Sequence, residues 1–467
     1  MGKISVKTYF LILLSLLSAY FLIKDVSIGF IYVLFTAFSI ITLQWFKSNF
    51  YKAAYLVLLS SVLAGYFLRP LILVDHPELF KYTKIAATTD IATISRSLYF
   101  ALFNLVLISA AFILVVKFVP DKVAEEKKES NYLLKHFNII NLIIVVITVT
   151  KILLNIYANT GSKIDADRDT TFGFVLKFLS PDLAFYVYYI YLTKYWKKLT
   201  IINRNLVLLM IFLTSMSVFL TGSKIFLALF GLCFFLNFVY NNRQIKVSNA
   251  IILTLVGILA IVFSFAMAFA VKYSGSKDTM AVLTKAETYT NSRDYIALGN
   301  DITGRLSGLD GQIAAYIVED QSNKRVEDAL KKSFSIKELT LHTIDNILPK
   351  VQLASSSNTG KAISENIVGF SSDAMHGGSL GLFASISYTS GDLFYLFDLA
   401  LGVFLGFYFV YTRRIKNDDL RFILFSIGGY FIIRLVLSGN FDIIFSDFTV
   451  EWIMLYFYVQ VIGFFKL

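Results

Sequence analysis

The chain has 467 residues, of which 57% are hydrophobic and 16% aromatic, and its mean hydropathy is +0.67. A soluble domain carries about 25% charged residues, whereas this chain carries 16%, so the composition excludes an ordinary soluble protein. We therefore expect the net charge of +11 to report membrane topology, not nucleic-acid binding. The single cysteine, Cys233, excludes an intrachain disulfide framework. With only 4 histidines, we expect no metal site.

Apolar runs recur along most of the chain, and many reach about 20 residues, the length at which a helix crosses the hydrocarbon core. The runs are continuous and do not alternate, which predicts helices and not a barrel. We expect an all-α polytopic membrane protein with about twelve transmembrane helices. In chain order the predicted spans are Val6–Ile23, Ser27–Trp45, Tyr51–Val74, Ser97–Val119, Ile139–Tyr157, Phe172–Tyr195, Asn205–Leu220, Ile225–Tyr240, Asn249–Val271, Gly391–Tyr411, Leu420–Ser438 and Val450–Phe465.

Residues 272–390, named the insert below, form the only long stretch without such a run. They separate nine predicted spans in residues 1–271 from three in residues 391–467. The insert is expected to contain short helices, because apolar residues recur in it at helical spacing. These residues and segments are Leu306, Leu309, Ile313, Ile317, Val326–Phe334 and Ile336–Leu348. Ser355–Ser379 is rich in Ser, Gly and Asn, which predicts a mobile loop.

The distribution of Lys and Arg between the loops predicts the orientation of the chain. With the N terminus inside, the cytoplasmic loops carry Lys47, Lys52, the group within Lys122–Lys135, Lys194, Lys197, Lys198, Arg204, Arg243, Lys246, Arg413, Arg414 and Lys416. The opposite loops carry fewer cations, namely Lys24, Lys81, Lys84, Arg96, Lys163, Arg168 and Lys224. We expect both termini in the cytoplasm and the insert outside, away from ATP and nucleotide sugars. Met1–Ile23 is expected to be retained as the first span, because no small-residue cleavage site follows it.

Four cations lie within or at the ends of predicted spans, namely Arg69, Lys151, Lys177 and Arg434. A cation in hydrocarbon is costly, so it faces a cavity or a partner unless its side chain reaches the interface. We favour the interfacial position for Lys151 and Lys177. For Arg69 and Arg434, both near the outer ends of their spans, the two possibilities are left open.

Two other places carry candidate anion-binding groups. Thr221–Lys224 joins two spans with almost no loop, which puts a lysine beside a helix N-terminus, where phosphates bind. The alternative is a tight turn with an interfacial lysine. In the insert, a polar cluster from Asn291 to Asp310 contains Arg293, Asp301 and Arg305. Guanidinium groups suit diphosphates, although Asp301 and Arg305 would equally pair along a helix.

His376 lies in a Gly-rich stretch where the insert returns to the membrane. It is a candidate general base, and the alternative is a histidine without a catalytic role. The chain contains no Walker loop, Rossmann glycine pattern, G-x-S-x-G or H-E-x-x-H. It therefore lacks the common soluble-site signatures of ATP, nicotinamide, serine-hydrolase or zinc chemistry, and we expect no cofactor.

The pattern resembles the oligosaccharide repeat-unit polymerases (O-antigen polymerases, Wzy type), which have about twelve spans, both termini inside and one large outer loop late in the chain. The turn Gly222-Ser223-Lys224 is similar to the Gly-Ser-Arg turn of that family, with lysine in place of arginine. Arg293 and Gly304 match the family's spacing of an arginine, ten residues and a glycine. Tyr388, Gly391 and the following L-F-D-L-A-L-G-V-F-L-G resemble its re-entry span.

The resemblance implies a GT-C-like fold in the inner (cytoplasmic) membrane of a bacterium, with the insert as a large periplasmic loop. It implies metal-independent glycosyl transfer between two undecaprenyl-diphosphate-linked oligosaccharides, which builds an O-antigen or capsule-type polysaccharide. The lipid diphosphate is the leaving group, so no nucleotide sugar is needed. A flippase and a chain-length regulator are the implied protein partners.

For this reaction we expect Arg69, Lys224, Arg293, Arg305 and Arg434 to neutralise the departing diphosphate. Asp310 or His376 would accept the proton of the acceptor hydroxyl. Asp310 is the preferred carboxylate, because it is expected to share one helical segment with Arg305.

Two alternatives remain open from the sequence. A lipid-linked glycan ligase shares this architecture and differs only in its acceptor. A flippase or transporter of lipid-linked oligosaccharides also has about twelve spans, but transporters ordinarily contain internal repeats, and none is visible in this chain.

Overall fold

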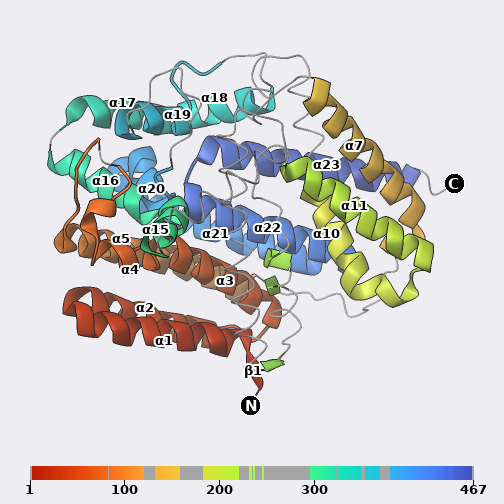
Figure 1. Cartoon of the computed structure of the whole chain (residues 1–467), viewed down its shortest axis with the longest axis horizontal. Helices are drawn as coiled ribbons and strands as arrows, with labels where there is room; N and C mark the ends of the chain where they lie inside the picture. Colours follow the sequence, from red (N-terminus) through yellow and green to blue (C-terminus); the bar gives the residue numbers. More distant parts are fainter. Residues whose placement is uncertain are drawn as a thin grey trace.

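The structure is a computed structural model of the whole chain. It describes residues 3–82, 84–119, 132–157, 182–219, 231–233, 235–236, 244–246, 295–321, 323–348, 353–368 and 379–464. In this part of the chain nearly all regular structure is helical (Figure 1). The one sheet pairs β1 (Lys3–Ser5) with β2 (Gln244–Lys246) in antiparallel register. The fold class is therefore all-α, as predicted.

Six described helices are long and apolar enough to cross a membrane, and they coincide with six of the predicted spans. They are α1 (Val6–Lys24), α2 (Val26–Trp45), the continuous stretch Asn49–Leu73, α5 (Ile91–Phe118), Leu382–Arg414, and α22 (Asp418–Ser438). Two further predicted spans contain shorter apolar helices at Phe137–Thr150 and Ile201–Thr214. The predicted spans Ile225–Tyr240 and Asn249–Val271 lie largely or wholly outside the described residues.

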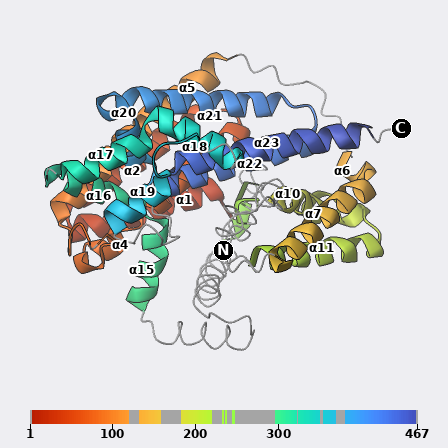
Figure 2. The ribbon, with the colours of Figure 1, turned by 90° about the horizontal axis from the view of Figure 1, so that it is seen from above.

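The third span is composite, and several further helices follow the fourth span. The stretch Asn49–Leu73 consists of α3 (Asn49–Val62), a π-helical turn (Leu63–Phe67) and α4 (Pro70–Leu73). After α5 come α6 (Tyr132–Lys135), α7 (Phe137–Tyr157), α10 (Asp182–Ile190) with a π-helical extension to Tyr195, and α11 (Ile201–Phe219). Helices α7 and α11 lie side by side, away from the insert helices α15, α16 and α17 (Figures 1 and 2).

The insert contains five described α-helices before its return segment: α15 (Tyr295–Leu306), α16 (Leu309–Asp320), α17 (Lys324–Phe334), α18 (Ile336–Ile347) and α19 (Thr359–Ile363). The chain then returns through α20 (Leu382–Ser390), α21 (Phe394–Arg414), α22 and α23 (Phe441–Phe464). The helices predicted over Val326–Phe334 and Ile336–Leu348 are confirmed as α17 and α18, whereas the helical face predicted from Leu306 to Ile317 is divided between α15 and α16. The prediction of a loop over Ser355–Ser379 is wrong for its first half, because α19 and a π-helical turn (Ser364–Val368) occupy it.

Side-chain contacts between loops show which loops lie at the same end of the helix bundle. At one end, Lys24 pairs with Asp75 at 3.0 Å, and Arg96 pairs with Asp320 of the insert at 3.1 Å. At the other end, Lys117 lies over the Trp45 ring. We name these the insert end and the opposite end, and the described loops alternate between them as the sequence predicts.

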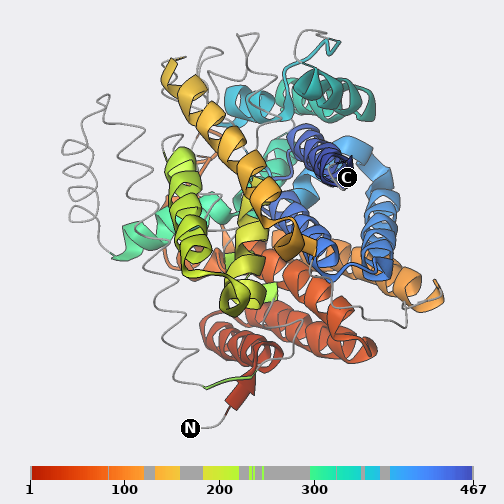
Figure 3. The same ribbon diagram turned by 90° about the vertical axis from the view of Figure 1, so that its right-hand side faces the viewer.

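Glycines set the closest helix contacts. Helices α5 and α21 run parallel. Gly402 lies against Ile108, and Gly406, one turn later in α21, lies against Val115, further along α5. A Cβ at Gly402 would lie 2.2 Å from the carbonyl oxygen of Ile108, so only glycine permits this approach. The same principle closes the hairpin of α1 and α2, where Gly29 packs on the backbone of Leu22. That hairpin forms one margin of the bundle (Figure 3).

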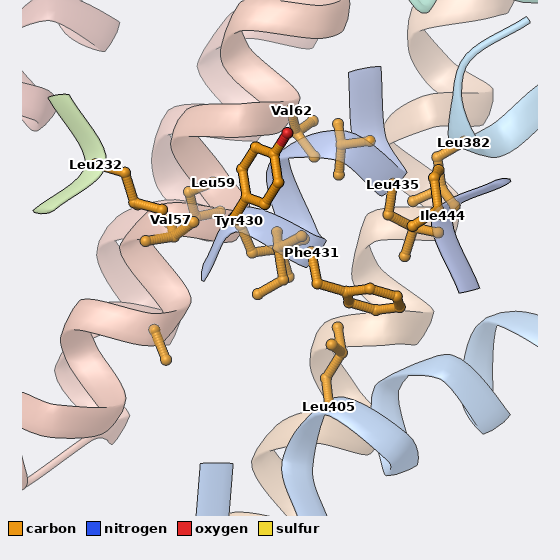
Figure 4. Close-up of a cluster of buried hydrophobic side chains, with 14 of the residues drawn as sticks. Val57, Leu59, Val62, Leu232, Leu382, Leu405, Tyr430, Phe431, Leu435 and Ile444 are labelled. Carbon is orange, nitrogen blue, oxygen red and sulfur yellow. The ribbon is translucent and has the colours of Figure 1, made fainter. Parts of the chain in front are cut away.

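The apolar core lies between α3, α21 and α22. Val57, Leu59 and Val62 of α3 contribute to one buried cluster with Tyr430 and Phe431 of α22 (Figure 4). Leu405 of α21, Leu435 of α22 and Ile444 of α23 belong to the same cluster, as do Leu232 and Leu382. This packing holds the ends of α3 and α22 beside the insert.

Candidate functional site

The end of the third span contains a local irregularity that exposes a backbone acceptor. In the π-helical turn the hydrogen bonds run from residue i+5 to residue i, as from the Leu68 amide to the Leu63 carbonyl at 2.9 Å. The same register directs the Gly65 carbonyl toward Pro70, which has no N–H. The Gly308 amide of the insert donates to this carbonyl instead, at 2.8 Å. The span end thus offers the insert a specific docking point.

The next contact at this place is made by Arg69, the residue before that proline. Its Nε donates to Oδ2 of Asp310 at 2.8 Å, across 241 positions of sequence. Its Nη1 donates to Asn300 Oδ1 at 2.7 Å and to Thr303 Oγ1 at 3.1 Å. Its Nη2 donates to the Leu79 carbonyl at 2.7 Å. The Arg69 side chain is 1% exposed and that of Asp310 is 0% exposed, so the guanidinium is fully enclosed by the insert and the loop after α4.

Asp310 lies in the first turn of α16, where its amide donates to Ser307 Oγ at 2.9 Å. Burial raises the pKa of Asp310, while the charges of Arg69 and Lys81 and the hydrogen bonds from Arg69 and Ser307 act against that rise. Its Oδ1 has no hydrogen-bond partner among the described residues. The arrangement is a buried ion pair with one free acceptor, shielded from solvent.

The predicted reason for choosing Asp310 is wrong. The chain breaks at Ser307 and Gly308, so Arg305 belongs to α15 and Asp310 to α16. The backbone packs closely at this break, because a Cβ at Gly308 would lie 2.7 Å from the Tyr66 ring. Asp310 instead has Arg69 as its partner.

Arg434 also has a carboxylate partner. Its Nη1 lies 2.6 Å from Oδ2 of Asp447 in α23, with the two side chains 24% and 30% exposed. Its guanidinium also lies over the Tyr430 ring, 5.6 Å from the ring centroid. Of the two possibilities for this residue, the structure shows a charged partner within the bundle.

The ends of α22 and of the third span meet at the insert's return segment. The Gly381 amide donates to the Ser438 carbonyl at 3.2 Å, and the Phe383 amide donates to the Tyr66 hydroxyl at 3.0 Å. Gly381 has φ +75°, a conformation that favours glycine. Arg69 and Arg434 therefore belong to one end of the bundle, each in its own ion pair, and no described hydrogen bond or ion pair joins them.

Several predicted site residues lie outside the described part of the chain. His376, Lys224 and Arg293 are not described, and of Arg305 only the backbone in α15 is. Gly304, the other member of the Arg293 spacing, is described and lies against the Arg69 guanidinium. Among the described residues no group of three or more His, Cys, Asp or Glu side chains is placed to hold a metal ion.

Sequence reasoning missed two carboxylates within the bundle. Asp447 lies just before the predicted last span, and Asp398 lies inside the re-entry span. A carboxylate inside or beside a span is itself a signal, because charged groups at that depth are costly without a partner or a function. The same rule that singled out Arg434 would have found Asp447 and Asp398.

Comparison of the chain with family models, with curated proteins and with solved structures gives no match.

Proposed function

We propose that the chain is a membrane glycosyltransferase that polymerises polyprenyl-diphosphate-linked oligosaccharide repeat units on the outer face of a bacterial cytoplasmic membrane. The observation that carries the proposal is the docking of the polar insert on the end of the third span through Arg69 and Asp310. A span end lies at the level of the lipid headgroups. A substrate whose diphosphate sits at that level and whose glycan projects into water would meet the insert directly.

In this proposal Arg69 is a positioning residue, since four of its five N–H donors are already occupied by Asp310, Asn300, Thr303 and Leu79. The diphosphate is neutralised by other cations of the same end. Lys81 is the described candidate, because it is exposed and its charge acts on Asp310. Lys224, Arg293 and Arg305 remain candidates from the sequence.

The proposed reaction is a displacement at the anomeric carbon. The acceptor hydroxyl oxygen forms a bond to that carbon as its bond to the diphosphate oxygen breaks, and the bonding pair leaves with the diphosphate. A general base takes the hydroxyl proton. Because Asp310 is enclosed and bound to Arg69, His376 is the preferred base in this proposal.

The proposal includes an orientation, with the insert outside and both termini in the cytoplasm, as the loop charges predict. It further includes about twelve spans. A ligase or a transporter of lipid-linked oligosaccharides remains the alternative.

The test is deletion of the gene in its host, followed by gel analysis of the surface glycan. A polymerase mutant keeps single repeat units and loses the ladder of longer chains. An unchanged ladder would overturn the proposal. A ligase mutant would instead leave polymer on the carrier lipid, and a transporter mutant would lose even the single unit at the surface.

A matched pair of variants tests the insert. Arg305→Ala is expected to abolish the ladder at normal membrane levels of the protein. Arg325→Ala, which removes an exposed arginine of α17, is expected to leave it intact. A normal ladder with Arg305→Ala would remove that residue from the site.

A further inference from the structure

One buried carboxyl group of the bundle is left unused by the proposed function. Asp398 lies in the second turn of α21, within a predicted span, and its side chain is fully buried, with 0% exposed. Neither carboxylate oxygen has a hydrogen-bond partner among the described residues, and no described ion pair includes Asp398. The two other carboxylates of this end considered above, Asp310 and Asp447, each have an arginine.

The neighbouring helix also presents an acceptor without a donor. Because Gly402 lies against Ile108 in the parallel pair of α21 and α5, the residues one turn earlier, Asp398 and Asn104, occupy the same level. Asn104 is 0% exposed, its Nδ2 donates to the Phe100 carbonyl at 2.6 Å, and its Oδ1 has no partner in the described structure. This level of the helix pair therefore has three unpartnered buried oxygen atoms.

The titratable groups on the packed elements do not supply a counter-charge. The Tyr66 hydroxyl of the π-helical turn is close enough to interact electrostatically with Asp398, but a hydroxyl carries no positive charge. Its described hydrogen bond is the one that it accepts from the Phe383 amide, and no described hydrogen bond reaches either oxygen of Asp398. On α3, Tyr55 donates to Ser109, and on α22, Arg434 pairs with Asp447. The other titratable or charged side chains of α5, α20, α21 and α22 and of the short turn before α21 are Arg96, Tyr99, Lys117, Tyr388, Asp392, Tyr395, Tyr408, Tyr411, Arg413, Arg414, Asp418, Asp419, Arg421 and Tyr430.

An ionised carboxylate without a donor or a cation is strongly disfavoured in an apolar interior. A proton removes the charge and gives the carboxyl group a donor of its own. A metal ion is a poorer match, because hard cations take six or more oxygen ligands, and only two side chains contribute here.

We propose that Asp398 is a proton-binding site inside the helix bundle, holding an uncharged carboxylic acid at the contact between α21 and α5. The proposal does not depend on the proposed function. Release of the proton requires water or a cation to reach this contact, which Gly402 and Gly406 close tightly. Proton release is therefore coupled to separation of the two helices.

Infrared spectroscopy of the full-length protein in lipid bilayers tests this proposal. A protonated carboxyl group and an ionised carboxylate absorb in separate regions. The wild type minus Asp398→Asn difference spectrum at neutral pH is expected to contain one protonated carboxyl band. Ionised carboxylate bands in that difference spectrum, in place of a protonated carboxyl band, would overturn the proposal.

Two further arms keep the outcome decisive. Asp398→Glu retains a carboxyl group in an altered position, so its protonated carboxyl band should persist at a shifted frequency. This variant gives a result even if Asp398→Asn fails to fold. Spectra are recorded in sodium chloride and in choline chloride at equal ionic strength. The band is expected in both, whereas its appearance in choline alone would assign the site to sodium and overturn the proton assignment.

Discussion

At the scale of single residues, Arg69, which the sequence analysis selected as a candidate for binding diphosphate, already has a carboxylate partner. Arg69 and Asp310 form an ion pair with almost no exposure. Enclosed pairs contribute less net stability than their short distances suggest, because both groups lose hydration. Removal of one member is costly, however, since it leaves the other charge buried and unpaired.

Arg69→Leu or Asp310→Leu alone is therefore expected to lower the free energy of unfolding by about 3–5 kcal/mol. The double variant Arg69→Leu/Asp310→Leu should lose less than the sum of the two. Thermal unfolding of the purified protein measures all three. The control is the exposed pair of Arg96 and Asp320, in which the Arg96 side chain is 48% exposed. Arg96→Ala should lower the free energy of unfolding by no more than about 1 kcal/mol. Additive losses at positions 69 and 310 would argue against a coupled pair.

A second carboxylate acts at this scale within the insert. Glu338 accepts hydrogen bonds from the amides of Ser355 and Ser356 at 3.0 Å and from both hydroxyls at 2.8 Å. Burial by itself raises the pKa of Glu338, but the bonds from Ser356 and Ser355 outweigh it and hold the pKa at about 2. The ordinary value is 4.5, so the folded state favours the ionised form.

This depressed pKa predicts a pH dependence with a definite sign. The stabilisation is fully present above the ordinary value of 4.5 and is lost as the pH falls from there toward about 2. Hydrogen exchange of the Ser355 and Ser356 amides, corrected for the intrinsic rate, should lose protection over that interval. Glu338→Gln should have low protection at every pH. Unchanged protection in this variant would show that the loop is held by other contacts.

At the scale of elements, close packing depends on residues without side chains. The parallel contact of α5 and α21 places the Gly402 Cα beside the Ile108 carbonyl, with no space for a methyl group. Added atoms in a tightly packed contact typically cost about 1–3 kcal/mol. Glycine in an open helical position is instead destabilising relative to alanine, by up to about 1 kcal/mol.

Gly402→Ala should therefore lower the free energy of unfolding by about 1–3 kcal/mol. Gly231→Ala, where a Cβ would meet nothing within 4 Å, is the matched control and should leave stability unchanged or slightly higher. Denaturation in detergent compares the two. Equal effects would mean that the α5–α21 contact tolerates a wider spacing.

At the scale of the whole molecule, the two ends of the bundle carry different elements and different ion pairs. The opposite end has the intrachain pair of Lys194 and Asp419 at 2.7 Å and the basic end of α21, with Arg413 and Arg414. The insert end has the ion pairs of Arg69 and Arg434. The proposed orientation places the insert end outside and the opposite end in the cytoplasm.

Cysteine labelling tests that orientation. In a Cys233→Ala background, Gln321→Cys places a thiol on the exposed end of α16, and Lys416→Cys places one on the exposed loop after α21. A membrane-impermeant maleimide added to intact cells should label position 321 and not position 416. Opening the membrane should allow both to react. The reverse pattern would place the insert in the cytoplasm and remove the proposed lipid-linked reaction.

The positions of the spans were predictable because a continuous apolar run of about 20 residues has few other stable environments. The predicted Ser27–Trp45 and Leu420–Ser438 agree with α2 and α22 within two residues. The last helix was harder, since α23 begins at Phe441 and not at Val450. Its polar first turn is stabilised by the Thr359 hydroxyl, which donates to Asp442 at 2.6 Å. No local pattern encodes that bond.

The sequence by itself determined the class of the molecule, the insert as its distinctive part, and the arginines that needed an explanation. Hydrocarbon imposes those features one segment at a time, through the cost of exposed polar groups. Only the tertiary structure decided that Arg69 is paired with Asp310, that α15 and α16 are separate helices, and that Asp398 has no described partner. Each of these depends on contacts between residues distant in the chain, and apolar periodicity carries no information about which distant residues meet.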